Sequence, residues 1–333
     1  MLTTNVGVMN RIPAGAERAE DGDMKKLLYK IAKAYYEDHL TQREISERLG
    51  LSRVKVSRLL GRARDEGVVQ IQVVSPEAGD ADLERELETQ WGLKEVVVVP
   101  EAAEGDVQLR HLGLGAASYL KRILQSREII ALAWGNSISA LVDQFTPFPL
   151  PEIRVVQMVG GLGDPESDSH GSDLARRLAN ALQARPRLLP APGVVRSRQI
   201  RDSLFHDPQI AGTLQMANSA DLAVVGIGTL NEGAVLRAGT ILSSADVTRL
   251  KRKRVVGNIC LHFFDADGQS VSDEIDERMI GLTLSEIRRL PRVIAIASGP
   301  AKFAAIRAAL TGRFVTVLIT DRGTALRLRS DRA

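Results

Sequence analysis

The sequence predicts a two-domain α/β protein, with a small helical domain at the N-terminus and a larger domain built on a mainly parallel sheet. The chain has 333 residues, which is too long for one small domain and is typical of two. Residues 41–67 carry the caps and the apolar spacing of two short helices around a tight turn. From Glu95 onward, short apolar runs alternate with helical segments, a pattern that predicts parallel strands with helices on both faces of the sheet.

Two capped helices are predicted between Thr41 and Gly67. Thr41 is a favourable N-cap, and Glu44 three residues later completes a capping box. Gly50 stands where a helix commonly ends in the left-handed conformation, and Ser52 can cap the helix that follows. The second helix has apolar residues at i, i+3, i+4 and i+7, namely Val56, Leu59, Leu60 and Ala63. Together these signals predict a helix-turn-helix.

The outward face of the second helix is basic. Between Leu51 and Arg64 the sequence has five basic residues and no acidic residue, which suits a surface that faces phosphates. A helix-turn-helix places its second helix in the major groove of DNA. An ordinary helical hairpin with a solvated basic face is the alternative, but the caps, the turn glycine, the core spacing and the one-sided charge agree on a DNA-binding motif. The expected DNA contacts are Thr41, Gln42, Ser52, Arg53, Lys55, Ser57 and Arg58.

The segments around this motif define the domain limits. Residues 1–22 lack periodicity and are expected to be a disordered lead, and a first helix is expected to begin near Asp23. Residues 68–74, VVQIQVV, are rich in β-branched residues and predict a strand, so the domain over residues 23–75 is expected to be a winged helix-turn-helix. Within the following segment, 76–94, a charged helix has Leu83, Leu87 and Trp91 on one side and is read as a connector, a dimer contact or both.

The second domain is expected over residues 95–333. Its predicted strands are short apolar runs at 95–100, 128–134, 153–159, 221–228, 293–299 and 316–320. Its clearest helices are predicted at 107–124, 137–145 and 172–184. Residues 263–268, FFDADG, are read as a turn between strands, because the regularly spaced carboxylates of a calcium loop are missing. The basic run at 251–254 is read as a solvated loop or helix end.

A ligand site is expected at the carboxyl ends of these strands, where open α/β sheets bind their ligands. Four strands end in glycine-containing turns, at 134–137, 160–164, 226–229 and 298–300. Glycine often occurs in such turns for steric reasons alone, but four turns that converge on one sheet edge favour a binding site. The first turn opens a helix, whose exposed N–H groups can bind a phosphate. His170 is either a solvated loop histidine or a hydrogen-bond partner for a ligand hydroxyl.

Several classes of protein are disfavoured by what the sequence lacks. It has no GxSxG, HExxH or phosphate-loop lysine motif, so no enzyme class is indicated. The single cysteine, Cys260, excludes an internal disulfide and argues against a thiolate metal site, and we expect neither a metal nor a cofactor. No apolar run reaches the roughly 20 residues of a membrane helix and no signal peptide is recognisable, so we expect a cytoplasmic protein with no membrane contact. The net charge of +3 is too small to indicate DNA binding by itself.

From about Met24 to the C-terminus, the chain resembles the SorC family of sugar-binding transcriptional regulators, which includes some proteins named DeoR. The resemblance is carried by the order and spacing of the segments YKIAKAYYEDHLTQREISERLGLSRVKVSRLL, WGNSIS, VVQMVGGLG, LPAP, DLAVVGIG, VVGNICLHFFDADG, IGLTLSEIRRLPRVIAIASG and VLITDRGTA. It implies a helix-turn-helix followed by an effector domain similar to ribose-5-phosphate isomerase and glucosamine-6-phosphate deaminase. It also implies a sugar, sugar phosphate or polyol effector and assembly as a homodimer or homotetramer.

The same resemblance implies a phosphate-binding loop after the second strand, sugar contacts from the next glycine loop, a floor under the ligand and a lysine that reaches a phosphate. The phosphate-binding loop corresponds to Gly135, Asn136 and Ser137, and the sugar contacts correspond to Gly160, Gly161, Gly163 and His170. The floor corresponds to Gly226, Gly228 and Asn258, and the lysine is Lys302. We therefore expect a regulator of carbohydrate metabolism genes that binds double-stranded operator DNA under the control of such an effector. Two alternatives remain open: a sugar-phosphate isomerase or deaminase with a DNA-binding appendage, and a constitutive DNA-binding protein whose second domain only oligomerises.

Overall fold

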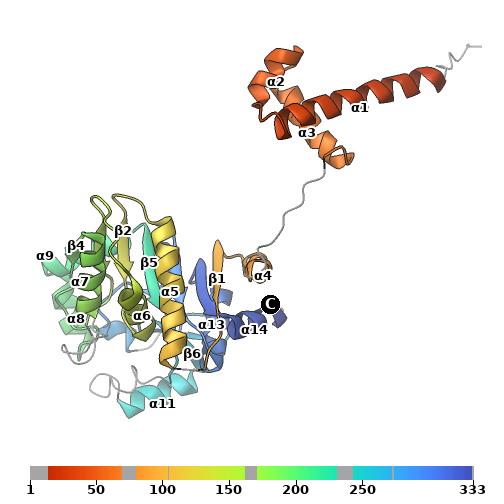
Figure 1. The fold of residues 1–333 in the computed structure, drawn as a ribbon. Coiled ribbons are helices and arrows are strands. Elements are labelled where there is room, and N and C mark those ends of the chain that lie inside the picture. The colour runs from red at the N-terminus through yellow and green to blue at the C-terminus, as the bar shows by residue number, and fades with distance from the viewer. Residues whose placement is uncertain are drawn as a thin grey trace, which may run out of the picture. The chain divides into compact units, whose positions relative to one another are not determined.

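The structure, a computed structural model, describes residues 14–69, 80–103, 105–161, 171–230, 243–271 and 274–331, with side chains described from Asp23 onward. The chain divides into two compact units, Met1–Pro76 and Glu77–Ala333. Three helices form the described part of the first unit: α1 (Ala14–Tyr36), α2 (Gln42–Leu49) and α3 (Arg53–Asp65) (Figure 1). Their shared core consists of Leu28, Ile31, Ala32, Ile45, Val56, Leu59, Leu60 and Ala63, all buried. The apolar spacing of α3 therefore has the packing role that the sequence predicted.

The first helix is longer than expected. It begins at Ala14 and not near Asp23, so the disordered lead expected over residues 1–22 is wrong for its last part. The physical reason is that AGAERAE, residues 14–20, is composed mainly of strong helix formers, although it has no apolar periodicity. The strand expected over residues 68–74 lies outside the described residues from position 70 onward. Val68 and Val69, which are described, pack partly buried against the core of the first unit.

A sheet of seven parallel strands forms the centre of the second unit, in the order β1-β9-β8-β5-β2-β3-β4. The strands are β1 (Glu95–Val99), β2 (Ile129–Leu132), β3 (Arg154–Gln157), β4 (Arg185–Arg187), β5 (Leu222–Gly226), β8 (Val293–Ile296) and β9 (Val317–Asp321). The predicted α/β class with a mainly parallel sheet is confirmed. The edge strand β4 was not predicted, because the exposed tripeptide Arg185-Pro186-Arg187 is polar and contains a proline.

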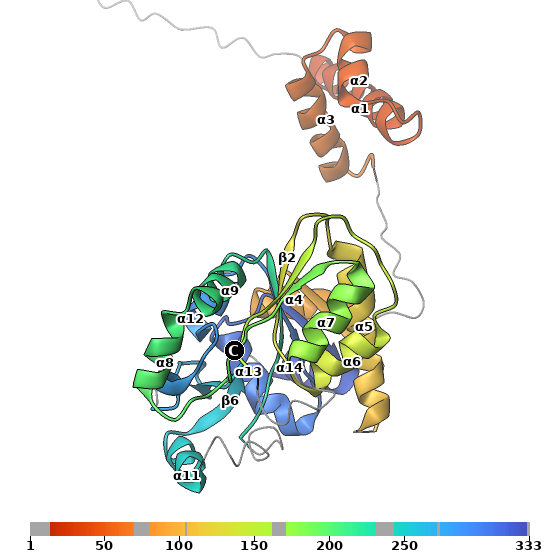
Figure 2. The same ribbon diagram turned by 90° about the vertical axis from the view of Figure 1, so that its left-hand side faces the viewer.

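Helices cover both faces of the sheet (Figures 1 and 2). One face packs against α5 (Asp106–Ile123), α6 (Asn136–Gln144) and α7 (Gly171–Leu182), and the other against α4 (Ala81–Trp91), α9 (Pro208–Asn218), α13 (Phe303–Thr311) and α14 (Arg322–Ser330). The strands serve both layers because successive side chains alternate between faces. In β2, Ile130 and Leu132 enter the first layer, whereas Ala131 enters the second. This two-sided burial explains why the strands are continuous apolar runs.

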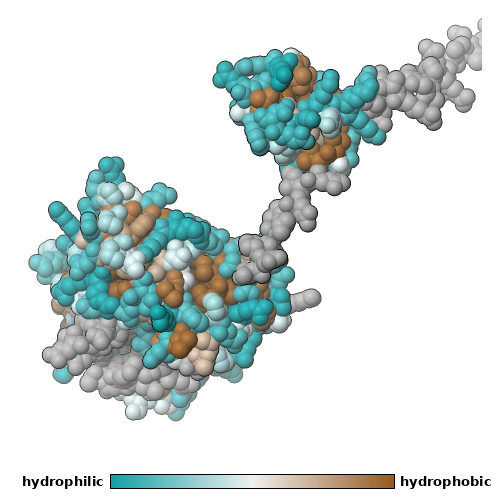
Figure 3. Space-filling view, in the orientation of Figure 1, coloured by the Kyte–Doolittle hydropathy of each residue, from teal (hydrophilic) through white to brown (hydrophobic). Residues whose placement is uncertain are grey.

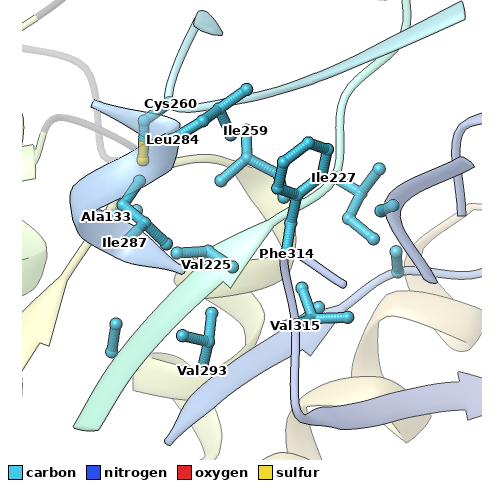
Figure 4. Packing of buried hydrophobic residues seen from close by; sticks show 14 of the residues in the cluster. Ala133, Val225, Ile227, Ile259, Cys260, Leu284, Ile287, Val293, Phe314 and Val315 are labelled. Atoms are coloured by element: carbon cyan, nitrogen blue, oxygen red, sulfur yellow. The ribbon is translucent and has the colours of Figure 1, made fainter. Parts of the chain in front are cut away.

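A β-hairpin, β6 (Val255–Ile259) and β7 (His262–Asp265), packs beside the sheet on α13. Beneath it, Ile259 joins Ile227, Leu284, Ile287 and Phe314 in one apolar cluster, seen in close-up in Figure 4. Three further helices in this region are α8 (Arg198–Phe205), α11 (Ser244–Arg252) and α12 (Leu284–Ile287). The turn after β7 is the one read from FFDADG, and Asp265 stabilises it by accepting hydrogen bonds from the backbone N–H groups of Asp267 and Gln269.

Helix α4 belongs to the sheet unit. Leu83 and Leu87 are buried against the sheet, and Gln90 Nε2 donates to the carbonyls of Leu328 at 3.1 Å and Asp331 at 2.7 Å. The apolar side of this helix is therefore occupied within the chain. A dimer contact of this helix, which the sequence left open, stays a prediction, and the buried side chains of Leu83 and Leu87 would not take part in it.

Candidate functional site

The helix-turn-helix is held by its own local hydrogen bonds. The Thr41 hydroxyl accepts from the Glu44 N–H at 3.3 Å, and the Glu44 carboxylate accepts from the Thr41 N–H at 2.7 Å. The hydrogen bonds from Thr41 keep the pKa of the Glu44 carboxyl below its usual value. Gly50 ends α2 at φ 63°, a left-handed conformation that glycine adopts without strain. Ser52 then caps α3 by accepting from the Lys55 N–H at 3.2 Å, so the turn between the helices is fixed at both ends.

The structure brings the predicted DNA contacts to the ends and outward face of these helices. Thr41, Ser52, Arg53, Lys55, Ser57 and Arg58 are exposed, and Gln42 is half-buried. The hydroxyls of Thr41 and Ser52 are engaged in the caps. Arg62, by contrast, pairs with Glu66 at the C-terminal end of α3. Within the part of the chain that the structure describes, no carboxylate pairs with Arg53, Lys55 or Arg58.

One exposed residue of α3 was missed by the sequence reasoning. Val54 is 79% exposed although it is apolar. The sequence could have shown this exposure, because Val54 is not among the apolar residues at i, i+3, i+4 and i+7 that begin at Val56 and form the buried side of the helix. Val54 is not part of the core of this unit, so that core gives no reason for an apolar side chain at this position.

The predicted effector site has a common frame in the sheet. Strands β8, β5, β2 and β3 are consecutive neighbours and parallel, so the turns that follow them lie at one edge of the sheet. Gly135 follows β2 and is the N-cap of α6 at φ 122°, with no side-chain cap. Asn136 and the buried Ser137 are the first residues of that helix. Among the described residues, no side chain caps the N–H groups at the start of α6, and such groups can donate to an anion or another acceptor.

Lys302 connects two of these turns. It ends a short 3-10 turn, Pro300–Lys302, and stands just before α13, whereas the sequence placed it in the first turn of the helix. Its Nζ donates a 3.1 Å hydrogen bond to the carbonyl of Ile227, which lies between Gly226 and Gly228. The ammonium group therefore lies beside the turn after β5.

The glycines of the four turns differ in what surrounds them. Among the described residues, a Cβ at Gly135 or Gly226 would have no neighbour within 4 Å, so both face space that the described structure leaves open. A Cβ at Gly160 would lie 2.4 Å from the carbonyl oxygen of Pro192, so this glycine is required by backbone packing. Gly161 is likewise tied to the backbone at Ala191, whose carbonyl accepts from its N–H at 3.0 Å. The glycine at position 160 therefore has a steric role, whereas position 161 is shown only to make a backbone hydrogen bond.

Asn258 lies on the hairpin and reaches the turn after β5. Its backbone exchanges two 2.9 Å hydrogen bonds with Gly228, and a Cβ at Gly228 would lie 2.8 Å from Asn258 Nδ2. Nδ2 is buried and has no hydrogen-bond partner among the described residues. The buried Nε1 of Trp134 also lacks a partner within those ranges. A buried donor without a partner costs about 1–3 kcal/mol, which a ligand oxygen can offset.

Two of the predicted effector residues, Gly163 and His170, lie outside the described residues. A histidine–carboxylate pair that the sequence did not indicate occurs elsewhere: His262 Nδ1 lies 2.8 Å from Asp276 Oδ1. Together with Thr283, this pair lines two cavities of about 400 and 840 Å³, neither of which is lined by a predicted effector residue. In the described ranges, no three His, Cys, Asp or Glu side chains gather as metal ligands do, and no helix is long and apolar enough to cross a membrane.

Comparison with known proteins assigns both units to known families of domains. The family model described as "Putative sugar-binding domain" matches residues 75–329, and the one described as "Crp-like helix-turn-helix domain" matches residues 25–77. The first match covers more than half of the chain, and the second covers the helix-turn-helix.

Known regulators are similar over nearly the full length. "Transcriptional regulator LsrR" of Enterobacter sp. strain 638 is 36% identical over 306 residues, which are 90% of this chain and 92% of that protein. The deoxyribonucleoside regulator of Bacillus subtilis strain 168 is 32% identical, over 93% of this chain and 99% of its own. The full-length sorbitol operon regulator SorC of Klebsiella pneumoniae has a crystal structure that matches with a TM-score of 0.72 at 32% identity, over 92% of this chain and 99% of that one. The chain belongs to the SorC family of sugar-binding transcriptional regulators, as its sequence segments indicated.

Proposed function

We propose that this protein binds double-stranded operator DNA through α3 and that a sugar, sugar phosphate or polyol bound at the strand ends controls that affinity. The observation that carries the proposal is the exposed start of α3, where Arg53, Lys55 and Arg58 have no carboxylate partner among the described residues. Cations left unpaired on one helix face suit phosphates and guanine edges. Arg53, Ser57 and Arg58 read base edges or nearby phosphates, and Lys55 contacts phosphate.

The capped N-termini of α2 and α3 support a placement of α3 against DNA with these two helix ends near phosphates. Thr41 and Ser52 use their hydroxyls inside the protein, and both stand at helix N-termini. The N–H groups at such termini bind phosphates, and contacts of this kind fix the register of the protein on the duplex. Half-buried Gln42, the first residue of α2, lies at the same terminus as Thr41.

The effector is held between the turn that opens α6 and the turn after β5. The N–H groups at Gly135, Asn136 and Ser137 bind a phosphate or hydroxyl oxygen. The side-chain Nδ2 of Asn258, buried without a partner in the described structure, donates to a ligand oxygen. The Lys302 ammonium supplies a positive charge beside Ile227. Gly163 and His170 belong to the same proposal by the family resemblance alone. The printed names of the relatives, which refer to deoxyribonucleosides and to a sorbitol operon, support a carbohydrate-like ligand.

Regulation requires at least a dimer on the operator. One recognition helix reads only a few base pairs, and two-fold proteins bind half-sites about 34–36 Å or a multiple apart. We include in the proposal a homodimer or homotetramer that acts in the cytoplasm, where its operator lies. A footprint of one half-site occupied by a monomer would contradict it.

The proposal treats the α/β unit as a sensor and not as an enzyme. The relatives are named as regulators, which supports this assignment. The alternative, a sugar-phosphate isomerase or deaminase with a DNA-binding appendage, predicts turnover of pentose or hexose phosphates. Assays of the purified chain with these substrates distinguish the two, because a sensor binds without conversion.

The experiment that tests the whole proposal combines selection and ligand screening. The full-length protein is used to select duplexes from a random-sequence library, and its melting temperature is then measured with sugars, sugar phosphates and polyols. A ligand that binds only the native state at 100 times its Kd stabilises the fold by about 2.7 kcal/mol. We expect a specific duplex and at least one stabilising carbohydrate that changes the affinity for it. A specific duplex with no stabilising carbohydrate would support a constitutive DNA-binding protein.

A further inference from the structure

The most exposed large apolar side chain in the described part of the chain stands on the recognition helix. Val54 is the second residue of α3 and is 79% exposed, compared with 58% for Val107 on α5, the next in order. It makes no contribution to the core of its unit, and a β-branched residue is not a strong helix former. Polar side chains cover most of the visible surface of this unit (Figure 3). Neither folding nor solubility explains a valine at this position.

Val54 heads a stripe of four residues on the outward side of α3. At 3.6 residues per turn, positions 54, 57, 58 and 61 share one face, away from the buried Val56 and Leu59. Ser57 and Arg58 in this stripe are exposed. A Cβ at Gly61 would have no neighbour within 4 Å among the described residues, so no packing in that part of the chain requires the glycine. Since glycine weakens a helix, its place here suits the close approach of another molecule.

We propose that Val54 contacts the 5-methyl group of a thymine in the major groove, and that this contact contributes to operator specificity. The inference rests on the DNA-binding function proposed above. On the major-groove edges of the bases, the thymine methyl is the apolar group, and it is read by apolar contact. Recognition helices contact base edges with their N-terminal residues, where Val54 lies. Arg53 and Lys55 flank it and can hold the phosphates on either side.

The same stripe predicts the neighbourhood of that thymine. Arg58 follows Val54 by four residues, which is about 6 Å along the helix axis. Base pairs are stacked about 3.4 Å apart. A guanine read by Arg58 is therefore expected one or two base pairs from the thymine read by Val54, within each half-site.

The test replaces single thymines by deoxyuridine, which lacks only the 5-methyl group. The duplex is the one selected by the full-length protein from a random library, and Kd is measured by fluorescence anisotropy at one salt concentration. Removal of the contacted methyl should weaken binding by the parent protein about three- to fivefold, as expected for one buried methyl group. Deoxyuridine at the other thymines should have no effect.

Protein variants then connect the effect to one side chain. Val54→Ala should weaken binding to the thymine duplex by a similar factor and should abolish the response to deoxyuridine at the critical position, so the two changes are not additive. Val107→Ala is the matched control, since it shortens an exposed valine of the other unit, and it should change neither Kd nor the deoxyuridine response. Both variants should keep the melting temperature of the parent because neither side chain is buried.

The outcomes separate this inference from the function on which it rests. If the parent protein binds a selected duplex but is indifferent to every thymine methyl, or if Val54→Ala responds to deoxyuridine as the parent does, the methyl contact is wrong and DNA binding stands. A selected half-site that contains no thymine would likewise show that the methyl contact is wrong and that DNA binding stands. If no duplex is selected at all, the proposed function and the contact are both wrong.

Discussion

The carboxylate of Glu84 accepts a 2.8 Å hydrogen bond from the backbone N–H of Val98, and Glu88 accepts one of 2.9 Å from Val96. Both N–H groups belong to β1, which is the last strand of the described sheet and pairs with β9 on its other side. An unpaired strand edge is a template for pairing with another chain. Two glutamates one helical turn apart on α4 therefore close this edge.

Glu84 gives a prediction about stability and pH. Burial raises the pKa of its carboxyl, although the Val98 N–H bond acts in the opposite direction. A carboxyl whose pKa is raised by folding stabilises the fold below its ordinary pKa, and this contribution is lost as the pH rises through the folded-state pKa. Glu84→Gln keeps an acceptor for Val98 without the charge. At pH 7 the free energy of unfolding of this variant, measured by urea denaturation, should be at least that of the parent. At pH 4.5 the difference in favour of the variant should be smaller.

Glu84→Ala is the control for the hydrogen bond. It leaves the Val98 N–H without its acceptor and should lower the free energy of unfolding by about 1–2 kcal/mol at both pH values. If Glu84→Gln were destabilised at pH 7 as much as Glu84→Ala, the charge itself would be needed and the stated effect of burial would be wrong.

Arg58 gives the prediction for DNA affinity. The side chain is exposed and has no carboxylate partner in the described structure, in contrast to Arg62, which pairs with Glu66. An arginine that reads guanine contributes about 1–3 kcal/mol and fixes one base of the site. Arg58→Ala should therefore weaken operator binding by roughly 5- to 150-fold and relax the preference at one position. Arg64→Ala should have a smaller effect, and equal losses with unchanged sequence preference would contradict the assignment.

Gly226 and Gly160 form a matched pair for the effector site. A methyl group at Gly226 would meet none of the described residues within 4 Å, whereas one at Gly160 would lie 2.4 Å from Pro192 O. Gly226→Ala should therefore fold normally and weaken effector binding by partly filling the space for the ligand. Gly160→Ala should lower the melting temperature with or without ligand, because overpacking typically costs about 1–3 kcal/mol. A stable Gly160→Ala variant with weak effector binding would instead place that loop in the ligand site.

Much of the fold could be predicted because short-range signals were sufficient. The capping box at Thr41, the left-handed Gly50 and the apolar spacing of α3 are each local, and each is present. The six predicted strands send side chains into both helix layers, so they appear in the sequence as apolar runs. Two of the elements that were missed lack such signals, because β4 is polar and α8 has no buried residue. The helices α11 and α12 were missed although each begins with a capping box.

The sites were harder to predict because their chemistry depends on contacts distant in sequence. Nothing in the sequence around Gly160 shows that Pro192 packs against it, or that Asn258 lies over Gly228. The same holds for Glu84, whose partner Val98 is 14 residues away on a strand edge. Glycine-rich turns therefore predicted one edge of the sheet as a candidate ligand site, but not which of the glycines face open space among the described residues.

Lys302 gives the prediction for effector recognition. Its Nζ donates to Ile227 O at 3.1 Å, which positions the charge at the turn after β5. Lys302→Ala should weaken binding of a phosphorylated effector more than binding of its unphosphorylated analogue, and should leave operator affinity without effector unchanged. Isothermal titration with both ligands gives the comparison. Equal affinities for parent and variant would show that the lysine only supports the Ile227 turn.

The coupling between the two sites gives the last prediction. The predicted DNA contacts end at Arg58 and the predicted effector residues begin at Gly135, in different units of the chain. We propose that effector and operator act on each other through a difference in effector affinity between arrangements of the oligomer that fit two half-sites and arrangements that do not. Linkage then requires reciprocity. If the effector lowers the affinity for operator by some factor, the operator must lower the affinity for effector by the same factor.

Couplings of about 1–3 kcal/mol, or roughly 5–150-fold, are typical of allosteric proteins. Effector Kd is measured by titration with and without a saturating operator duplex, and operator Kd with and without saturating effector. The two ratios should be equal. Val107→Ala serves as a surface control that should leave both ratios unchanged. A ligand whose Kd is the same with and without operator cannot be the regulatory effector, however tightly it binds, because it cannot shift the population of the DNA-binding arrangement.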